Sequence, residues 1–273
     1  MEKQPNVTPA PSTDWIPLSR SFILMLSRKQ LFGWSLALFL ITILLTWIGY
    51  LLTVDFMDSL TASFMTTTPV TESIWGWIKH QGWRAGSWLF VIVSRIVAFY
   101  FAFLIAYTLT TPGYAFLSKA AEKLHAGEHF AADAGFTVAG VIRDILEGMK
   151  IALFGIGVTI AAILVNFIPG VGQVAVVLLY TFYSTLLFID YPASRRRWSL
   201  RRKIDWLRTH NGIALRIGLL PALISMIPVL NIFAIALLFP LLTIHATLNF
   251  SAIELAKNYP VTSPGGLFYG KRD

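Results

Sequence analysis

Two long stretches without Asp, Glu, Lys or Arg, residues 151–189 and 217–253, constrain the fold of this chain more than any other feature. They contain 39 and 37 residues, whereas a single helix needs roughly 20 to cross the hydrocarbon core of a bilayer. Each contains an Ile-Pro step near its middle or first third, at Pro169 in the first and Pro228 in the second, and lipid normally demands unbroken helix. Both stretches are therefore predicted to be helical hairpins that return to the side of the membrane they left.

The composition places the whole chain in the membrane class. Of the 273 residues, 56% are hydrophobic and only 13% are charged, and the mean hydropathy is +0.66, which is far from the soluble globular range. Two further apolar segments, 30–54 and 87–111, are long enough to be transmembrane helices. We therefore expect an all-α membrane protein with two long transmembrane helices, two helical hairpins that penetrate partly, and amphipathic interfacial helices.

The remaining segments can be placed around these spans. We expect a disordered N-terminus over 1–12, a single membrane domain over 13–255 and a cytoplasmic tail over 256–273. Within the domain we expect in-plane amphipathic helices near 14–28 and 199–210, a loop over 55–86, and two helices broken around 127–135 within 119–150. The arginines of the 199–210 helix are predicted to face anionic lipid.

The orientation follows from the distribution of basic residues. Residues 190–215 hold seven Arg and Lys against two Asp, whereas the loop over 55–86 is net acidic. Since basic loops stay on the cytoplasmic side, both hairpins should start and end there, with both termini cytoplasmic. Halving either hairpin leaves about 18 residues per arm at ~1.5 Å each, so the sequence leaves open whether the arms cross the membrane fully or are re-entrant.

The hairpin tips are the candidate substrate path. A helix that starts inside the membrane directs unpaired N–H groups and the positive end of its dipole at the space before it, which suits an anion. Gly170 and Gly172 would allow the turn between the helices. The proposed path residues are Asn166, Gly170, Gly172, Gln173 and Asn231, and the proposed structural turns are at Pro169, Pro192 and Pro228. The alternative is that Ile-Pro-Gly merely turns a hairpin and packs on a neighbour.

Other residue patterns narrow the function. Arg95 interrupts the second transmembrane helix and is expected either to contact an anion or to form a structural ion pair. The chain has no Cys, no phosphate-binding Gly-x-x-x-x-Gly-Lys-Ser/Thr loop and no acidic residue inside the two uncharged stretches. We therefore expect no enzyme activity, no cofactor, no metal site and no nucleic-acid partner, and, if the protein transports, passive conduction.

Several segments, in order and with compatible spacing, resemble one family. These are "TTPGYAFLSKAAEKLHAG" from 110, "NFIPGVGQ" from 166, "DYP" from 190, "IPVLNIF" from 227 and "HAT" from 245. Over roughly 15–255 they resemble the CysZ sulfate permeases of the etoposide-induced membrane protein family. The resemblance implies an inner-membrane protein that takes up sulfate for cysteine synthesis and associates into oligomers.

The resemblance also marks individual residues. The matching positions are Pro112, Glu122, Gly127, Pro169, Gly170, Gly172, Gln173, Asp190, Tyr191, Pro192, Pro228 and Asn231. Where the family has a Gly-hydrophobic-Arg-Arg stretch associated with sulfate binding, this chain reads "SRKQLFGW", so Arg28 and Lys29 supply the two positive charges. Arginine grips a tetrahedral oxyanion through two N–H groups and lysine does not, so the expected substrate is widened from sulfate to sulfate or a related oxyanion. The competing hypothesis is a non-transporting membrane scaffold that anchors lipid or a protein partner.

Overall fold

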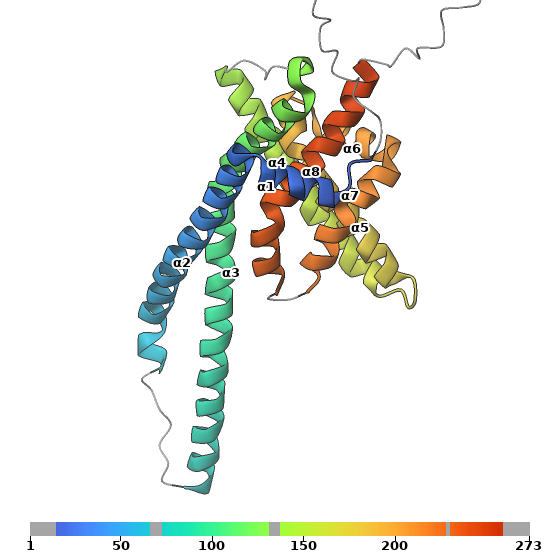
Figure 1. Cartoon of the computed structure of the whole chain (residues 1–273). Helices are drawn as coiled ribbons and strands as arrows, with labels where there is room; N and C mark the ends of the chain where they lie inside the picture. Colours follow the sequence, from blue (N-terminus) through green and yellow to red (C-terminus); the bar gives the residue numbers. More distant parts are fainter. Residues whose placement is uncertain (1–14, 66–72, 131–136, 228–229, 259–273) are drawn as a thin grey trace, which may run out of the picture. The chain divides into compact units, whose positions relative to one another are not determined.

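The computed structural model describes residues 15–65, 73–130, 137–227 and 230–258, and within them every regular element is helical (Figure 1). In chain order the elements are α1 (Leu18–Ser27), α2 (Lys29–Met65), α3 (Ile74–Ala126), the 3₁₀ turn η1 (Gly127–His129), α4 (Val138–Asn166), α5 (Gly172–Arg195), α6 (Leu200–Thr209), α7 (Asn211–Ser225) and α8 (Leu230–Asn258). The predicted N-terminal disorder over 1–12 lies outside the described residues, as does Pro228.

Within this part of the chain, five helices are long and apolar enough to cross a bilayer. The candidate spans are Lys29–Ala62, Ile74–His129, Leu146–Asn166, Gly172–Arg195 and Phe233–Asn258, while α1 and α7 are apolar but shorter. The expectation of an all-α membrane protein is confirmed. Because the helices form two compact units, Leu36–Gly113 and the rest of the chain, each unit is described by itself.

The unit Leu36–Gly113 contains most of α2 and α3 as an antiparallel pair. Its interface is built from small side chains: Ala98, Ala102 and Ala106 are buried at four-residue spacing. A Cβ added at Gly49 would lie 3.2 Å from the Cβ of Ala102, so the two backbones approach closely there. Close contact through small residues is the usual way for helices to associate in lipid, where burial of apolar surface gives no driving force.

Both long helices extend well beyond the predicted spans, which corrects the loop expected over 55–86. α2 continues to Met65 and α3 begins at Ile74, so most of the expected loop is helical. α3 also runs through Pro112 and ends at Ala126. Asp55 and Asp58 lie on the exposed surface of α2, where charge is compatible with helix because the side chains reach water or a partner.

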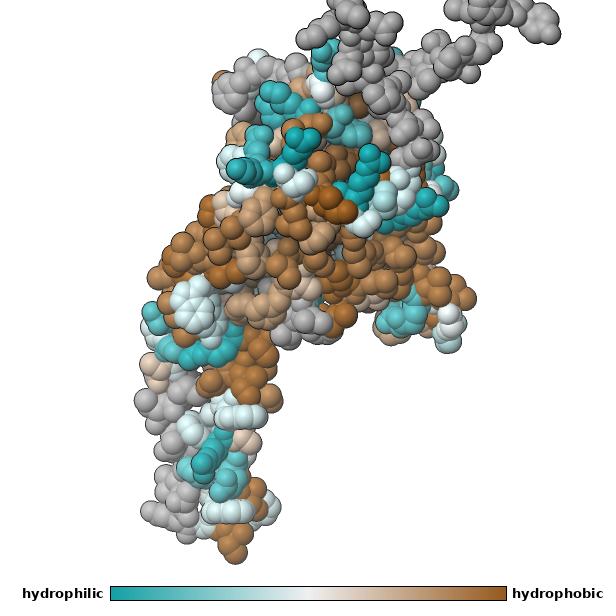
Figure 2. All heavy atoms as spheres, in the orientation of Figure 1, coloured by the Kyte–Doolittle hydropathy of each residue, from teal (hydrophilic) through white to brown (hydrophobic). Residues whose placement is uncertain are grey.

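The other unit is organised around α8. Residues 241–252 of this helix are all buried, and α1, α5 and α7 pack against it. Figure 1 shows α4–α5 and α7–α8 as two helical hairpins whose tips lie on the same side of this unit, at the bottom of the view. In Figure 2 the surface of this unit toward the tips is mainly hydrophobic, and hydrophilic side chains gather toward the end that carries α6.

The amphipathic helix predicted over 199–210 is present as α6. Ser199 occupies the cap position without a side-chain hydrogen bond. Instead, the Glu147 carboxylate on α4 accepts a hydrogen bond from the Leu200 N–H, with 2.7 Å between Oε2 and N. Lys203 is fully buried, because its ammonium bonds to Asp190 on α5. Two contacts from distant positions therefore fix α6.

Candidate functional site

The tip of the α4–α5 hairpin has the turn chemistry that its sequence predicts. Gly170 adopts φ +78°, a left-handed conformation that glycine takes without strain. A Cβ at Gly172 would lie 2.5 Å from the Val165 carbonyl oxygen, so only glycine allows this close approach. Across the turn, Gln173 Nε2 donates to Asn166 Oδ1 at 2.7 Å. The two amides thus face one another at the point where α4 ends and α5 begins.

Backbone donors remain available at the start of α5. The N–H of Gly172 bonds to the Ile168 carbonyl at 2.9 Å, and the N–H of Ala175 bonds to the Val171 carbonyl at 3.0 Å. Within the described range 137–227, the N–H groups of Gln173 and Val174 have no backbone hydrogen bond. These are the second and third residues of the helix, where unsatisfied donors are expected.

The surface of this tip is exposed and apolar. Phe167 is 80% exposed, and Ile168, Val171 and Val174 are also exposed. Pro169 lies in the exposed turn, as predicted for a residue that ends the incoming helix. The tip of the first hairpin is thus an exposed apolar surface of its unit.

The α7–α8 tip is closed by Asn231. Its side-chain Nδ2 donates to the Ser225 carbonyl at 3.1 Å, and its backbone N–H donates to the Ile227 carbonyl at 3.0 Å. Because Ser225 ends α7, the Asn231 side chain caps the carboxyl end of that helix across the turn. Unlike Gln173, Asn231 is only partly exposed.

Arg28 and Lys29 lie at the junction between α1 and α2, and both are exposed. Among the described residues neither side chain has a hydrogen bond or an ion pair. Figure 1 shows this junction well away from both hairpin tips of the same unit. Arg28 and Lys29 are therefore exposed cations without an ion pair in the described part of the chain, and they lie apart from the tips. Their contact with an anion stays a prediction.

Arg95 forms an ion pair. Its Nη1 and Nη2 atoms each lie 2.9 Å from one carboxylate oxygen of Asp58 on α2. Of the two alternatives left open by the sequence, the structure shows the pairing. A role as an anion contact, which would need Arg95 to exchange partners, stays a prediction.

Pro192 is not in a turn, which corrects the sequence-based expectation. It is buried inside α5, three residues before the helix ends at Arg195. A proline there removes one intrahelical hydrogen bond near the end of the helix. Arg196 Nη1 donates to the Pro192 carbonyl at 3.4 Å, which helps to satisfy the last turn.

A buried ionic cluster at the end of α5 was not anticipated from the sequence. The Glu122 carboxylate, only 1% exposed, pairs with both Arg195 and Arg196. The two guanidinium groups also lie over aromatic rings, Arg195 over Phe130 and Arg196 over Phe250. In the sequence, only the family resemblance singled out Glu122, and the resemblance did not indicate which residues pair with this carboxylate.

A second ionic contact lies beside this cluster. Lys203 Nζ lies 2.5 Å from Asp190 Oδ1 and 2.9 Å from Ser194 Oγ. Asp190 is the first residue of the "DYP" motif, so the structure gives this motif residue a structural partner. The base of the first hairpin is thus fixed by buried ion pairs, while its tip is exposed.

Two helical hairpins with their tips on one side, packed around a buried helix, together with five apolar helices of membrane-spanning length, define a multi-pass helical membrane protein. A family model described as "Sulfate transporter CysZ/Etoposide-induced protein 2.4" matches residues 18–236. The chain belongs to this family.

Curated relatives agree with the family match. Proteins named "Sulfate transporter CysZ" from Salmonella typhimurium, Salmonella paratyphi A and Salmonella enteritidis are each 30% identical to this chain over 156 residues. The matched segment covers 54% of this chain and 60% of each relative. The chain therefore matches about three fifths of the length of these curated relatives.

Proposed function

We propose that this protein carries sulfate or a related oxyanion across the inner membrane as an energy-independent conduit that serves sulfur assimilation. The observation that carries the proposal is the family match over residues 18–236. The curated relatives are named as sulfate transporters, which suggests the substrate class.

The geometry of the first tip supports an anion path. The Gln173 and Val174 N–H groups and the Asn166–Gln173 amide pair lie together at the start of α5. A helix N-terminus carries roughly half a positive charge, which attracts an anion without an ionised side chain. Dipoles hold an ion weakly enough to release it, as conduction requires. Asn231 would serve the same path at the second tip.

The free cations at the α1–α2 junction support capture of the anion before it reaches the tips. Arg28 and Lys29 are exposed and have no ionic partner among the described residues. Unpaired positive charge raises the local concentration of an anion and its rate of arrival. The uncharged stretches 151–189 and 217–253 contain no Asp or Glu, which argues against a proton relay and supports passive conduction.

The dimensions support a partly penetrating hairpin in an oligomer. α7 has 15 residues, or roughly 22 Å at ~1.5 Å per residue, less than the ~30 Å of a bilayer core. The tip of the α7–α8 hairpin would then lie inside the membrane. In this proposal residues 13–255 form a single membrane domain, and both termini are cytoplasmic. Irregular backbone at that depth needs cover, so other copies of this chain are the proposed cover for the exposed Phe167 and Val171.

Uptake of labelled sulfate into liposomes that contain the purified full-length chain tests the proposal. We expect saturable uptake, slowed roughly tenfold or more at low sulfate by Arg28→Ala with Lys29→Ala, because electrostatic attraction changes arrival rates by that order. Lys79→Ala with Arg84→Ala, which removes two exposed charges from α3, is the matched control. No flux of sulfate, sulfite, molybdate or phosphate would contradict the proposal and favour the membrane scaffold.

A further inference from the structure

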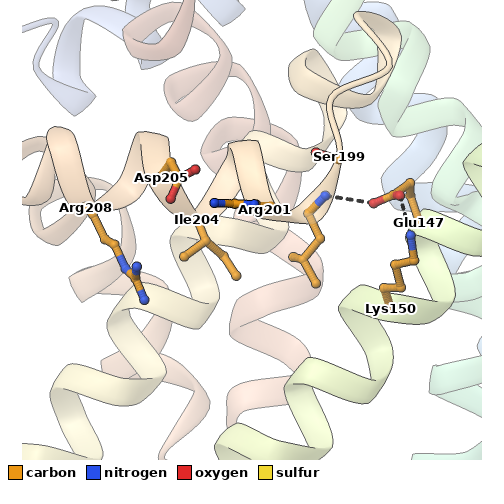
Figure 3. Close-up of a pocket in the computed structure, with 8 residues that line it drawn as sticks. Glu147, Lys150, Ser199, Arg201, Ile204, Asp205 and Arg208 are labelled. Atoms are coloured by element: carbon orange, nitrogen blue, oxygen red, sulfur yellow. Dashed lines mark hydrogen bonds and ion pairs between the residues drawn. The ribbon is translucent and has the colours of Figure 1, made fainter.

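An open groove of about 470 Å³ lies between the first half of α4 and α6 (Figure 3). Glu147 and Lys150 of α4 form one wall, and α6 with the preceding Ser199 forms the other. All of its lining residues belong to one compact unit. The groove is separate from both hairpin tips, so the site considered for sulfate does not include it.

The carboxylate of Glu147, the acidic residue of the α4 wall, already accepts hydrogen bonds from within the protein. Glu147, which is 8% exposed, accepts from the Leu200 N–H through Oε2 and from Lys150 Nζ through Oε1, each at 2.7 Å. The Lys150 side chain nevertheless remains 58% exposed. Since an ammonium has three N–H donors, Lys150 can donate to Glu147 and to a ligand in the groove at once.

The α6 wall supplies two further cations. Arg201 and Arg208 are exposed and lie seven residues apart, so two helical turns bring them to the same face. Among the described residues neither has an ion-pair partner within 4.0 Å. Asp205 lies between them on the groove and is also unpaired in this range. Ile204 gives the wall an apolar patch beside the charges.

The groove lies where α4 becomes a candidate membrane span. That span begins at Leu146, one residue before Glu147. Beyond the groove, α4 exposes the apolar side chains of Leu153, Ile156 and Ile160. A cationic groove that continues into a lipid-facing helix surface suits a molecule with an anionic head and apolar chains.

We propose that this groove binds an anionic phospholipid, with the headgroup phosphate held by Arg201, Arg208 and Lys150 and an acyl chain along the exposed face of α4. Guanidinium groups bind phosphate oxygens through paired N–H donors. The helix α6 is a firm support for these arginines, because buried Lys203 bonds to Asp190 and Trp206 Nε1 donates to Glu254. A free oxyanion would contact only the charged side chains of the groove, whereas a phospholipid would also pack its acyl chain against the exposed apolar side chains of α4.

Native mass spectrometry of the purified full-length chain in detergent, titrated with phosphatidylglycerol or phosphatidylcholine, tests the proposal. We expect preferential binding of phosphatidylglycerol, weakened roughly tenfold or more by Arg201→Gln with Arg208→Gln, since each basic residue near the headgroups adds to anionic lipid binding. The matched control is Arg202→Gln with Arg143→Gln, which removes two exposed arginines of α6 and α4 outside the groove.

Two further measurements separate the proposal from other outcomes. Arg201→Lys with Arg208→Lys keeps the charges but loses the paired N–H donors, so it should bind phosphatidylglycerol more tightly than the glutamine variant and less tightly than the unchanged chain. Millimolar inorganic phosphate or sulfate should not displace the lipid. Equal loss in the control variant, no preference between the two lipids, or displacement by free anion would overturn the proposal, and none of these outcomes depends on sulfate uptake.

Discussion

The two helical hairpins look alike in the sequence and differ in the structure. In α8, 72% of the most apolar stretch is buried, against 22% in α4 and 39% in α5. The second hairpin therefore supplies the centre of its unit, while the first turns much of its surface outward. Hydropathy alone does not separate these two roles, because lipid and protein interior both select apolar side chains.

Polar residues reveal the difference once the partners are known. α8 buries His245, whose Nδ1 lies 3.0 Å from Ser21 Oγ, and Thr247, whose hydroxyl donates to Ser118 at 2.9 Å. The first hairpin instead presents residues such as Leu153 and Ile163 to its surroundings. A membrane helix that carries several polar side chains is thus expected inside the protein, since each polar group needs a hydrogen-bond partner that lipid does not supply.

The largest effect is expected at the base of the first hairpin, where Glu122 holds Arg195 and Arg196. Glu122→Gln breaks two buried ion pairs at once, so the free energy of unfolding should fall by about 3 to 5 kcal/mol. Unfolding of the purified protein in detergent measures it.

Asp205→Asn is the control for this substitution, because Asp205 is exposed and has no ion pair among the described residues. Its effect should stay within about 0.5 kcal/mol. Equal effects of the two substitutions would mean that buried charge does not fix the base of the hairpin.

A smaller effect on stability is expected from adding a methyl group to a glycine, and it should differ between α7 of the second hairpin and α4 of the first. A methyl group at Gly218 on α7 would clash with the Thr181 carbonyl and the Thr185 hydroxyl on α5. Gly218→Ala should therefore destabilise the protein by about 1 to 3 kcal/mol. Gly157 on α4 has open space around it, so Gly157→Ala should be neutral or slightly stabilising. Thermal unfolding of both variants measures the contrast, and a harmless Gly218→Ala would contradict the close contact of α5 with α7.

The smallest contrast compares two side-chain amides. Asn249 on α8 is buried and bonds to both the N–H and the carbonyl of Ile16, at 3.0 and 3.1 Å. Asn249→Ala leaves those groups unsatisfied and should cost about 1 to 3 kcal/mol. Gln173→Ala at the exposed tip should cost no more than about 0.5 kcal/mol. Denaturant titration in mixed micelles compares them, and a larger cost at Gln173 would mean that the tip is a buried structural element.

Much of the fold could be predicted because the relevant signals are local. Uncharged stretches interrupted by proline and glycine predicted the α4–α5 and α7–α8 hairpins, and alternating arginines and apolar residues predicted α6. The break after Gly127 was also predicted, and the residue there adopts φ +53°. Each of these features depends on neighbours within a few positions.

The contacts that depend on tertiary packing could not be predicted. Asp58 suggested a loop until the structure placed it beside Arg95, 37 positions away. Pro192 suggested a turn, although the end of a helix tolerates it. Glu147 caps α6 from 53 positions away, and no local pattern indicates such a partner. For the candidate site, the tip geometry was predictable, whereas the distance of Arg28 and Lys29 from it was not.

The central claim is that an oxyanion passes the α4–α5 tip, and the absence of native cysteine allows a direct test. A Gln173→Cys variant in sulfate-loaded liposomes would be treated with a charged thiol reagent while sulfate flux and the rate of labelling are followed. Labelling should stop the flux, and sulfate should slow the labelling. Full labelling with unchanged sulfate flux would contradict the claim.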